Sequence, residues 1–405
     1  MTLTTPVSRA PEHVRFLVLG GGSAGISTAA RLAREGHASD TAIVEPSDVH
    51  YYQPLWTLVG GGAASREETR RNEADVIPPG VSWIKDAVTG FDPDDNAVML
   101  RGGSRVRYDY LVIALGLQVN WTAVKGLKES LGSLGVCSNY SYDTVNFTWD
   151  AIRTFKGGDA IFTHPATPVK CGGGPQKIMY LADDAFRRQG VREQARIHFF
   201  IGEPVIFKCE HYARTLLQII ERKGILPPNY KHNLVEIRPE SREAVFEDLG
   251  ANKEVVQRFD MLHVTPPQGP LEVVKQSGLG NQAGWIDVDK ETCRHVRHAN
   301  IFSLGDCSSL PTSKTAAAIR KQVVVLTKNL LAVAGGGQPA ERYDGYTSCP
   351  LVTGYGKLVL AEFGYDLKPK ETFPFDQNKE RWSMYQLKRH VLPQLYWKGM
   401  LKGIA

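Results

Sequence analysis

Residues 14–25 read VRFLVLGGGSAG, a mostly apolar run followed at once by a glycine-rich turn. The run Val14–Leu19 predicts a buried β-strand, and the Ala-, Leu- and Arg-rich residues after the turn predict a helix. Gly20, Gly22 and Gly25 are spaced as in the turns that hold the pyrophosphate of a dinucleotide at a helix N-terminus. This stretch therefore predicts a nucleotide-binding unit.

The next predicted strand supplies the acidic residue that such a unit uses. Thr41–Val44 is a short apolar run that ends on Glu45, 20 residues after Gly25. In a dinucleotide-binding βαβ unit, an acid at this place accepts hydrogen bonds from the adenosine ribose. We therefore interpret the first 45 residues as a Rossmann-like βαβ unit.

A second motif indicates that the nucleotide is FAD. Residues 300–306 read NIFSLGD, which resembles the late motif of FAD-dependent pyridine-nucleotide oxidoreductases, where the aspartate, here Asp306, binds the ribityl chain. A member that uses NAD(P)H would carry a second glycine fingerprint after the predicted strand Ala160–Thr163. The chain instead reads HPATPVKCGGGP over residues 164–175, so Cys171 stands where that pyrophosphate would bind.

The cysteines divide into candidates for chemistry and candidates for core packing. Cys171 precedes three glycines and a predicted helix start, which favours a thiolate because helix N-termini stabilise negative charge. Cys349 lies 178 residues further along the chain, so its partnership with Cys171 depends on the fold. The sequence contains no CxxC and no Cys/His cluster with zinc spacing, and we expect no metal site. Three cysteines are interpreted as small buried residues: Cys209, Cys293 and Cys307.

Length and composition bound the class of protein. The chain has 405 residues, of which 42% are hydrophobic and 22% charged, as in ordinary globular proteins of two or three domains. A net charge of +5 is too small to indicate nucleic acid. No stretch reaches the roughly 18 to 20 apolar residues of a spanning helix. The first residues lack a secretory signal, and a homo-oligomer is compatible with the sequence.

The strand and helix signals predict an α/β protein with two Rossmann-like domains. The FAD-binding domain is expected in two parts, interrupted by an inserted α/β domain, and a C-terminal region follows. The predicted boundaries are 1–120 for the first part of the FAD domain, 121–295 for the insertion, 296–345 for the return and 346–405 for the C-terminal region.

Long stretches of the chain resemble sulfide:quinone oxidoreductases, close to their mitochondrial branch. They include VEPSDVHYYQPLWTLVGGG, TPVKCGGGPQKIMY, TSKTAAA, YDGYTSCPLVTGY and ETFPFDQNKERWSMY. The resemblance implies a disulfide between Cys171 and Cys349 beside the flavin. Sulfide would attack Cys349, leaving a persulfide there and a thiolate on Cys171, and an acceptor such as sulfite or glutathione would take the sulfane sulfur. Two electrons would pass through FAD to ubiquinone or another membrane quinone.

The same resemblance assigns further residues. Cys137 is similar to a third cysteine of other branches, and a role in sulfur handling stays open beside plain burial. Lys314 would stabilise reduced flavin by its charge, the alternative being an exposed lysine at a helix start. The residues expected to contact FAD, besides the fingerprint glycines, are Ser23, Ala24, Glu45, Gln53, Val88, Asp306, Lys314 and Thr315.

The C-terminal stretch 381–405 interleaves aromatic and aliphatic residues with five Lys/Arg and no Asp or Glu. This composition suits a segment that lies in a membrane interface, although an amphipathic helix packed on the protein's own core is the commoner use of such a pattern. We expect a peripheral membrane protein of a bacterial inner membrane, or of the mitochondrial inner membrane if a targeting segment is missing. Three aromatic residues could line a quinone slot: Phe363, Phe373 and Phe375.

Three other functions fit parts of the sequence. A type II NADH:quinone oxidoreductase shares the FAD architecture but needs the second fingerprint and no cysteine pair. A flavocytochrome-type sulfide dehydrogenase would pass electrons to a haem partner, and the apolar, basic C-terminus favours a quinone instead. A non-enzymatic redox-sensing flavoprotein would bind FAD without reducing quinone.

Overall fold

The computed structural model describes residues 5–7 and 9–405. Its first sheet has the strand order β5-β2-β1-β8-β7-β6, with β19 paired to β8. β1, β2, β5, β8 and β19 run parallel, whereas β6 and β7 form an antiparallel extension. The strands are β1 (His13–Leu19), β2 (Thr41–Val44), β5 (Ser82–Ile84), β6 (Val88–Asp92), β7 (Ala97–Leu100), β8 (Arg105–Ile113) and β19 (Ile301–Ser303).

Helices α1 (Ser23–Leu32) and α9 (Ala316–Ala334) pack on this sheet and on each other. Parallel strands with buried faces read as continuous apolar runs, which is why Phe16–Leu19, Thr41–Val44 and Leu111–Ile113 are fully buried. The predicted βαβ unit is therefore present, and the segment around residue 300 returns to the same sheet beside β8.

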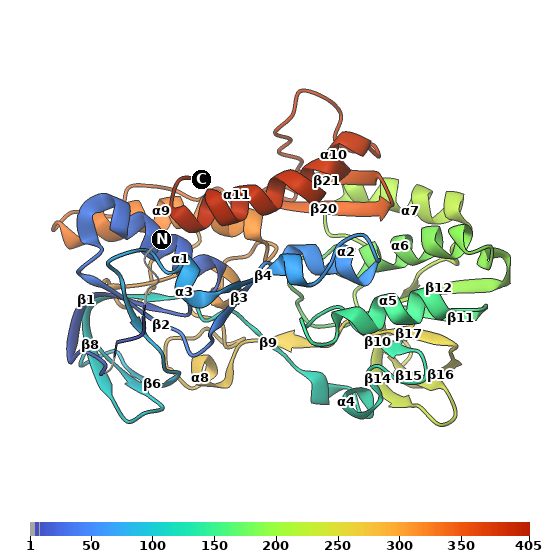
Figure 1. The fold of residues 1–405 in the computed structure, drawn as a ribbon, viewed down its shortest axis with the longest axis horizontal. Helices are drawn as coiled ribbons and strands as arrows, with labels where there is room; N and C mark the ends of the chain where they lie inside the picture. The colour runs from blue at the N-terminus through green and yellow to red at the C-terminus, as the bar shows by residue number, and fades with distance from the viewer. Residues whose placement is uncertain (1–4, 8) are drawn as a thin grey trace.

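A second sheet is parallel throughout and has the order β10-β17-β11-β12-β13. Helices α5 (Val145–Thr154), α6 (Gly174–Arg188) and α7 (Glu210–Lys223) accompany it, and Figure 1 shows it beside the first sheet, joined to it through β9 and β18. The strands are β9 (Gln118–Val119), β10 (Val136–Cys137), β11 (Gly158–His164), β12 (Ala195–Ile201), β13 (Asn229–Tyr230), β17 (Met261–His263) and β18 (Gln268–Gly269). The α/β class is confirmed, whereas the four domain boundaries stay predictions.

The antiparallel sheet β14-β15-β16 has no counterpart in the sequence analysis. Its strands are β14 (His232–Arg238), β15 (Glu243–Asp248) and β16 (Lys253–Arg258). β16 alternates exposed and half-buried residues, and charged side chains on this solvent face weaken the period-two pattern that marks a strand. Shorter elements complete the chain before the C-terminal region: β3 (Val49–Tyr51), β4 (Arg70–Asn72), α2 (Trp56–Gly60), α3 (Glu73–Val76), α4 (Leu127–Ser130) and α8 (Glu272–Lys275).

The C-terminal region begins with the hairpin β20 (Thr347–Gly354) and β21 (Lys357–Phe363) and ends with α10 (Trp382–Gln386) and α11 (Leu392–Lys398). Figure 1 shows α10 and α11 lying along one side of the molecule, over both sheets. Among the described residues, no helix is long and apolar enough to cross a bilayer.

Candidate active site at a cysteine pair

The fold brings together the two cysteines that the sequence separates. Cys171 lies in the loop between β11 and α6, and Cys349 lies on β20, which packs against α6. Both are free thiols, and their Sγ atoms are 2.8 Å apart. Cys349 is fully buried, whereas Cys171 is partly accessible. This separation lets two sulfur atoms exchange a bond without movement of the backbone.

The loop that carries Cys171 is held in an uncommon conformation. Cys171 has a φ of +56°, in the left-handed region that residues with a side chain adopt rarely. Two backbone hydrogen bonds maintain it, from Cys171 N–H to the Lys314 carbonyl at 2.8 Å and from Gly174 N–H to the Cys171 carbonyl at 2.6 Å. The strained residue therefore docks directly on the segment predicted to contact the flavin.

Lys177, which the sequence analysis missed, lies at the cysteine pair. It is in the first turns of α6, its side chain is 3% exposed, and its Nζ is 3.0 Å from Cys171 Sγ. The hydrogen bond from the Cys349 thiol and the ammonium of Lys177 together hold the pKa of Cys171 well below its usual range, against the effect of burial. Burial and the neighbouring Cys171 raise the pKa of Cys349 well above its usual range. Cys171 is thus the thiolate of the pair.

A second lysine reaches the pair from the C-terminal region. Lys388 follows α10 and is buried, and its ammonium donates to the Pro54 carbonyl at 3.0 Å. Burial first, and then the charge of Lys177, lower the pKa of Lys388 to about 7, with the two cysteine sulfurs acting in the opposite direction. Sequence alone gave no signal for this role, because Lys388 reads as one of several basic residues on an amphipathic segment.

The glycines of the fingerprint have distinct roles in the structure. Gly20 has a φ of +100°, and a side chain on Gly25 would place its Cβ 1.8 Å from the Gly20 carbonyl oxygen. A Cβ on Gly22 would meet nothing within 4 Å. The first turn of α1 has neither a side-chain cap nor an acidic residue. Gly20 and Gly25 therefore serve the fold, while Gly22 and the helix N-terminus face open space suited to an anion.

The two motifs of the sequence analysis meet each other. A Cβ on Gly305 would lie 3.1 Å from the Cβ of Ala24. Asp306 follows it, and burial raises the pKa of Asp306 against the charges of Lys314 and Lys170. A small cavity adjoins this contact and is lined by Gly305, Leu310, Thr312, Ser313, Lys314, Thr315, Ala318, Ile319 and Gln322.

Lys314 and Thr315 connect this cavity to the cysteine pair. The Lys314 ammonium donates to the carbonyls of Asp306 and Ser308 at 2.6 and 3.2 Å and lies 4.0 Å from the centre of the Trp285 ring. Thr315 caps α9 and is 2.9 Å from the hydroxyl of Thr347 on β20. Lys314 is therefore half-buried and bonded within the protein, and its effect on a flavin stays a prediction.

Glu45, Gln53 and Val88 occupy different parts of the structure. The Glu45 carboxylate accepts hydrogen bonds at 2.7 Å from the N–H groups of Gly21 and Ser47, so it anchors the turn. Gln53 accepts a hydrogen bond from Lys170, beside Cys171. Val88 begins β6, in the antiparallel extension of the first sheet. A contact of Val88 with a nucleotide stays a prediction.

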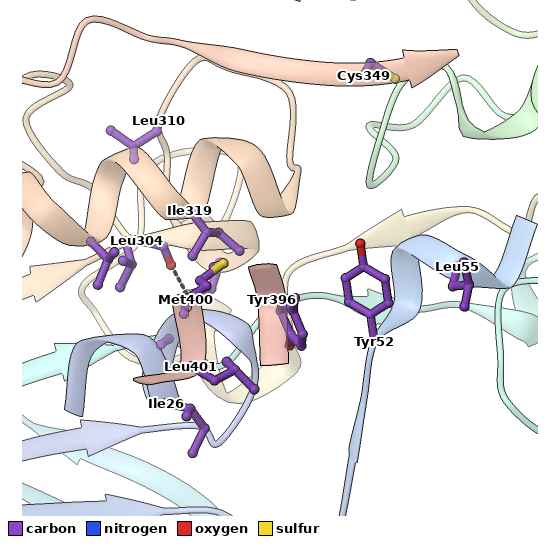
Figure 2. Close-up of a cluster of buried hydrophobic side chains, with 14 of the residues drawn as sticks. Ile26, Tyr52, Leu55, Leu304, Leu310, Ile319, Cys349, Tyr396, Met400 and Leu401 are labelled. Atoms are coloured by element: carbon purple, nitrogen blue, oxygen red, sulfur yellow. Dashed lines mark hydrogen bonds between the residues drawn. The ribbon is translucent and has the colours of Figure 1, made fainter. Parts of the chain in front are cut away.

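The C-terminal helix α11 closes over the dinucleotide turn. The hydroxyl of Ser23 donates to Tyr396 Oη at 2.7 Å, Tyr396 donates to His50 Nε2, and His50 Nδ1 donates to the Gly21 carbonyl at 2.9 Å. Figure 2 shows Tyr396 facing Tyr52, with ring centres 4.6 Å apart, Leu401 beside Ile26 of α1, and Met400 beside Ile319 of α9. The sequence analysis missed this network, in which Tyr396 lies more than 300 residues from both Ser23 and His50.

The other cysteines and the proposed quinone residues are placed as follows. Cys137 is fully buried at the end of β10, and burial raises its pKa to about 12, so a role in sulfur handling stays a prediction. Phe363 packs in the core against Phe207, while Phe373 and Phe375 stack on each other at 5.2 Å. Within the described ranges, no group of three His, Cys, Asp or Glu side chains could hold a metal ion. Cys209, Cys293 and Cys307 are buried.

Comparison with known proteins connects this geometry to a family. Residues 14–148 match the family described as pyridine nucleotide-disulphide oxidoreductase. The chain is 49% identical to the mitochondrial sulfide:quinone oxidoreductase of Mus musculus over 97% of its own length and 88% of that protein. This chain belongs to the sulfide:quinone oxidoreductase family. As a member of this family, it is a flavoprotein oxidoreductase, as the resemblance predicted.

Two further sulfide:quinone oxidoreductases are similar to this chain, one in sequence and one in fold. The mitochondrial protein of Dictyostelium discoideum is 48% identical over 96% of this chain and 86% of that protein. The X-ray structure of the sulfide:quinone oxidoreductase from Aquifex aeolicus superposes with a TM-score of 0.82, covering 98% of this chain and 93% of that one. Sequence identity to it is 19%, so that comparison supports the fold alone.

Proposed function

We propose that this member of the sulfide:quinone oxidoreductase family oxidises hydrogen sulfide at Cys171 and Cys349 and passes two electrons through FAD to a membrane quinone. The observation that carries the proposal is the sulfur pair, 2.8 Å apart, with the Lys177 ammonium 3.0 Å from one sulfur. A buried lysine beside one of two touching thiols lowers the pKa of that thiol and prepares it to be the leaving group.

The residues of the dinucleotide turn fit FAD. Because residue 22 is glycine, the space in front of it is open, and any side chain at this position would occupy the space proposed for the pyrophosphate. The start of α1 has no side-chain cap, so its N–H groups can donate to that pyrophosphate. Glu45 would accept from the ribose, and Asp306 and Lys314 line the path from the turn to the cysteines. Gln53, Val88, Ser23, Ala24 and Thr315 complete the set of residues that we propose to contact FAD. Bound FAD would supply the acceptor for two electrons.

The sulfur chemistry follows from the unequal environments of the two thiols. With the Cys171–Cys349 disulfide formed, hydrosulfide bonds to the Cys349 sulfur, the disulfide breaks, and its electron pair stays on Cys171. Cys349 then carries a persulfide, and Lys177 stabilises the Cys171 thiolate. A nucleophilic acceptor such as sulfite or glutathione removes the outer sulfur. Re-forming the disulfide from the Cys171 thiolate and the Cys349 thiol releases two electrons, which bound FAD would accept, and one proton.

The quinone partner requires access to a membrane, and the exposed apolar residues of the C-terminal region support it. Trp382 is 68% exposed and Ile404 63%, and Val391 and Leu395 are exposed as well. The opposite face of this segment packs on the protein through Met384, Tyr385 and Tyr396. We therefore propose peripheral attachment to a bacterial or mitochondrial inner membrane through the outer face alone.

The test replaces each cysteine by serine. Cys171→Ser and Cys349→Ser should yield folded protein that retains FAD but does not reduce a ubiquinone analogue with sulfide, because neither can form the disulfide. Cys209→Ser, at a buried cysteine that immediately precedes α7, is the control and should keep the activity. Full sulfide:quinone activity in either Cys171→Ser or Cys349→Ser contradicts the proposal.

A further inference from the structure

Buried polar side chains without a partner gather behind the cysteine loop. Among the described residues, half of the side-chain atoms of this kind lie in two stretches of chain, 138–148 after β10 and 263–268 from the end of β17 onward. Unpaired buried groups are rare in folded proteins, and each calls for a ligand, a water molecule or a catalytic role. In these two segments they are Ser138 Oγ, Tyr140 Oη, Thr148 Oγ1, His263 Nδ1, Thr265 Oγ1 and Gln268 Nε2.

This polar cluster is attached to the loop that carries Cys171. The carboxamide oxygen of Gln268 accepts from Lys170 N–H at 2.8 Å, one residue before Cys171. His263 and Asn139 share a hydrogen bond on the other side of the cluster. The cluster therefore lies at the carboxyl ends of β10 and β17, the edge of a parallel sheet where ligands and substrates are bound in α/β proteins.

Tyr140 is the member of the cluster whose hydroxyl shares a close neighbour, Gly174, with Cys171. Tyr140 is 7% exposed, and its hydroxyl makes no hydrogen bond of good geometry, although the equally unpaired Thr265 hydroxyl lies near enough to oppose the rise of its pKa. The Cβ position of Gly174 lies 2.8 Å from Tyr140 Oη and 4.0 Å from Cys171 Cβ, so the hydroxyl and Cys171 approach the same glycine. Burial, reinforced by the charges of Cys171 and Cys349, raises the pKa of Tyr140. The phenol is thus a hydrogen-bond donor throughout the range in which the enzyme would work.

We propose that the Tyr140 hydroxyl donates a hydrogen bond to the sulfur that gains negative charge when hydrosulfide opens the Cys171–Cys349 bond. This inference rests on the proposed function. Hydrosulfide forms a bond to Cys349, the electron pair of the broken bond stays on Cys171, and Tyr140 keeps its proton. Lys177 approaches the pair from α6, whereas Tyr140 approaches from the segment after β10. Tyr140 bonds neither sulfur in the resting structure, so its hydrogen bond forms as the charge develops, and Lys177 and Tyr140 together then stabilise that charge.

The free hydroxyl of Tyr140 is consistent with a donor held in reserve for this charge. A buried hydroxyl that serves only packing would be expected to bond a neighbouring carbonyl, because leaving it unpaired destabilises the fold. Replacing this hydroxyl by hydrogen removes only its weak contact with the Thr265 hydroxyl from the resting protein. The conservative variant Tyr140→Phe therefore separates a role in the reaction from a role in folding.

The experiment compares two FAD-loaded variants with the wild-type protein. Tyr140→Phe should keep its FAD content and its melting temperature, while flavin reduction by sulfide slows by about tenfold to a hundredfold. In the reduced protein, the pH at which Cys171 ionises, read from the pH dependence of its alkylation, should move upward. Tyr108→Phe is the matched control, since the Tyr108 hydroxyl is also buried and unpaired but belongs to β8. That variant should behave like the wild-type protein.

Two outcomes overturn the inference. One is an unchanged sulfide reaction and an unchanged Cys171 ionisation in Tyr140→Phe, and the other is an equal slowing in Tyr108→Phe. Failure of the proposed function looks different, because then sulfide would not reduce the flavin of the wild-type protein at all.

Discussion

At the scale of single residues, the site depends on charges brought to two sulfur atoms. Lys177 and Lys388 lie 211 residues apart in the chain, yet both act on the cysteine pair. Two buried ammonium groups near one another repel, and this contributes to a pKa of Lys388 of about 7 while the neighbouring thiols raise the pKa of Lys177 despite its burial. One lysine is thus firmly charged, and the other can change its charge near neutral pH.

Removing the charge of Lys177 should change the ionisation of Cys171. The pKa of Cys171 is lowered, so its thiolate persists to low pH, and a neutral neighbour should shift its ionisation to higher pH. In reduced Lys177→Met, we expect the midpoint of Cys171 alkylation to rise by about one to three pH units. Lys177→Arg, which keeps the charge, should shift less. An unchanged midpoint in Lys177→Met would show that the ammonium does not set this pKa.

Gly22 offers a direct check of the nucleotide site. In Gly22→Ala, the new methyl group would meet no protein atom but would enter the space assigned to the pyrophosphate. We expect the FAD-free variant to keep the melting temperature of the FAD-free wild-type protein. Its FAD content should fall by about tenfold or more, because even one extra methyl group is costly in a tight contact with the pyrophosphate. FAD content is measured from absorbance after gel filtration. Full retention of FAD would exclude this position for the pyrophosphate.

At the scale of elements, helix α6 and strand β20 position the two sulfurs. Gly173, just before α6, faces β20 so closely that a Cβ would lie 2.1 Å from Leu351 and 2.9 Å from Cys349 Sγ. Its neighbour Gly172 has open space at the same position. The two adjacent glycines therefore form a matched pair for mutation.

Gly173→Ala should push β20 away from the loop and separate the sulfurs, while Gly172→Ala should not. Overpacking of this kind costs about 1 to 3 kcal/mol, so we expect a folded but less stable protein. Its disulfide should form poorly, as read by counting free thiols after mild oxidation. Equal thiol counts in the two variants would show that the α6–β20 contact does not control the pair.

The basic residues of the C-terminal segment 381–405 bear on how this segment would bind a membrane. Four of the five basic residues of this segment are engaged within the protein. Lys388 is buried and Arg389 pairs with Glu68 at 2.9 Å. Arg381 and Lys402 donate to backbone carbonyls at 3.0 and 3.5 Å. Attraction to anionic lipid is therefore weaker than composition suggests, and apolar contact carries more of the proposed binding.

The double variant Trp382→Ser/Leu395→Ser should bind vesicles of phosphatidylcholine and phosphatidylglycerol at least about tenfold more weakly in sedimentation. The control is Leu249→Ser/Val256→Ser, two exposed apolar residues near the β14–β16 sheet, on the opposite side of the molecule in Figure 1. If both double variants lose binding equally, attachment is not localised to the C-terminal segment.

At the scale of the whole molecule, local sequence patterns predicted individual strands, turns and helices but not the contacts between distant segments. Hydrophobic periodicity and glycine spacing can be recognised in a single sequence. They predicted the strand, turn and helix at the fingerprint, the strand near residue 300 and helix α6. The contacts between distant segments have no such signal. Lys177 looks like any helical lysine, Tyr140 like any core tyrosine, and Tyr396 like part of an amphipathic stripe. Their roles arise only when β20, α6 and α11 are packed together.

The measurement that tests the central claim most directly is anaerobic mixing of the FAD-loaded protein with sulfide, followed by a soluble ubiquinone analogue, with NADH in a parallel sample. Our account predicts that sulfide bleaches the flavin, that the quinone restores it, and that NADH has little effect. Bleaching by NADH and not by sulfide would contradict it and favour an NADH:quinone oxidoreductase.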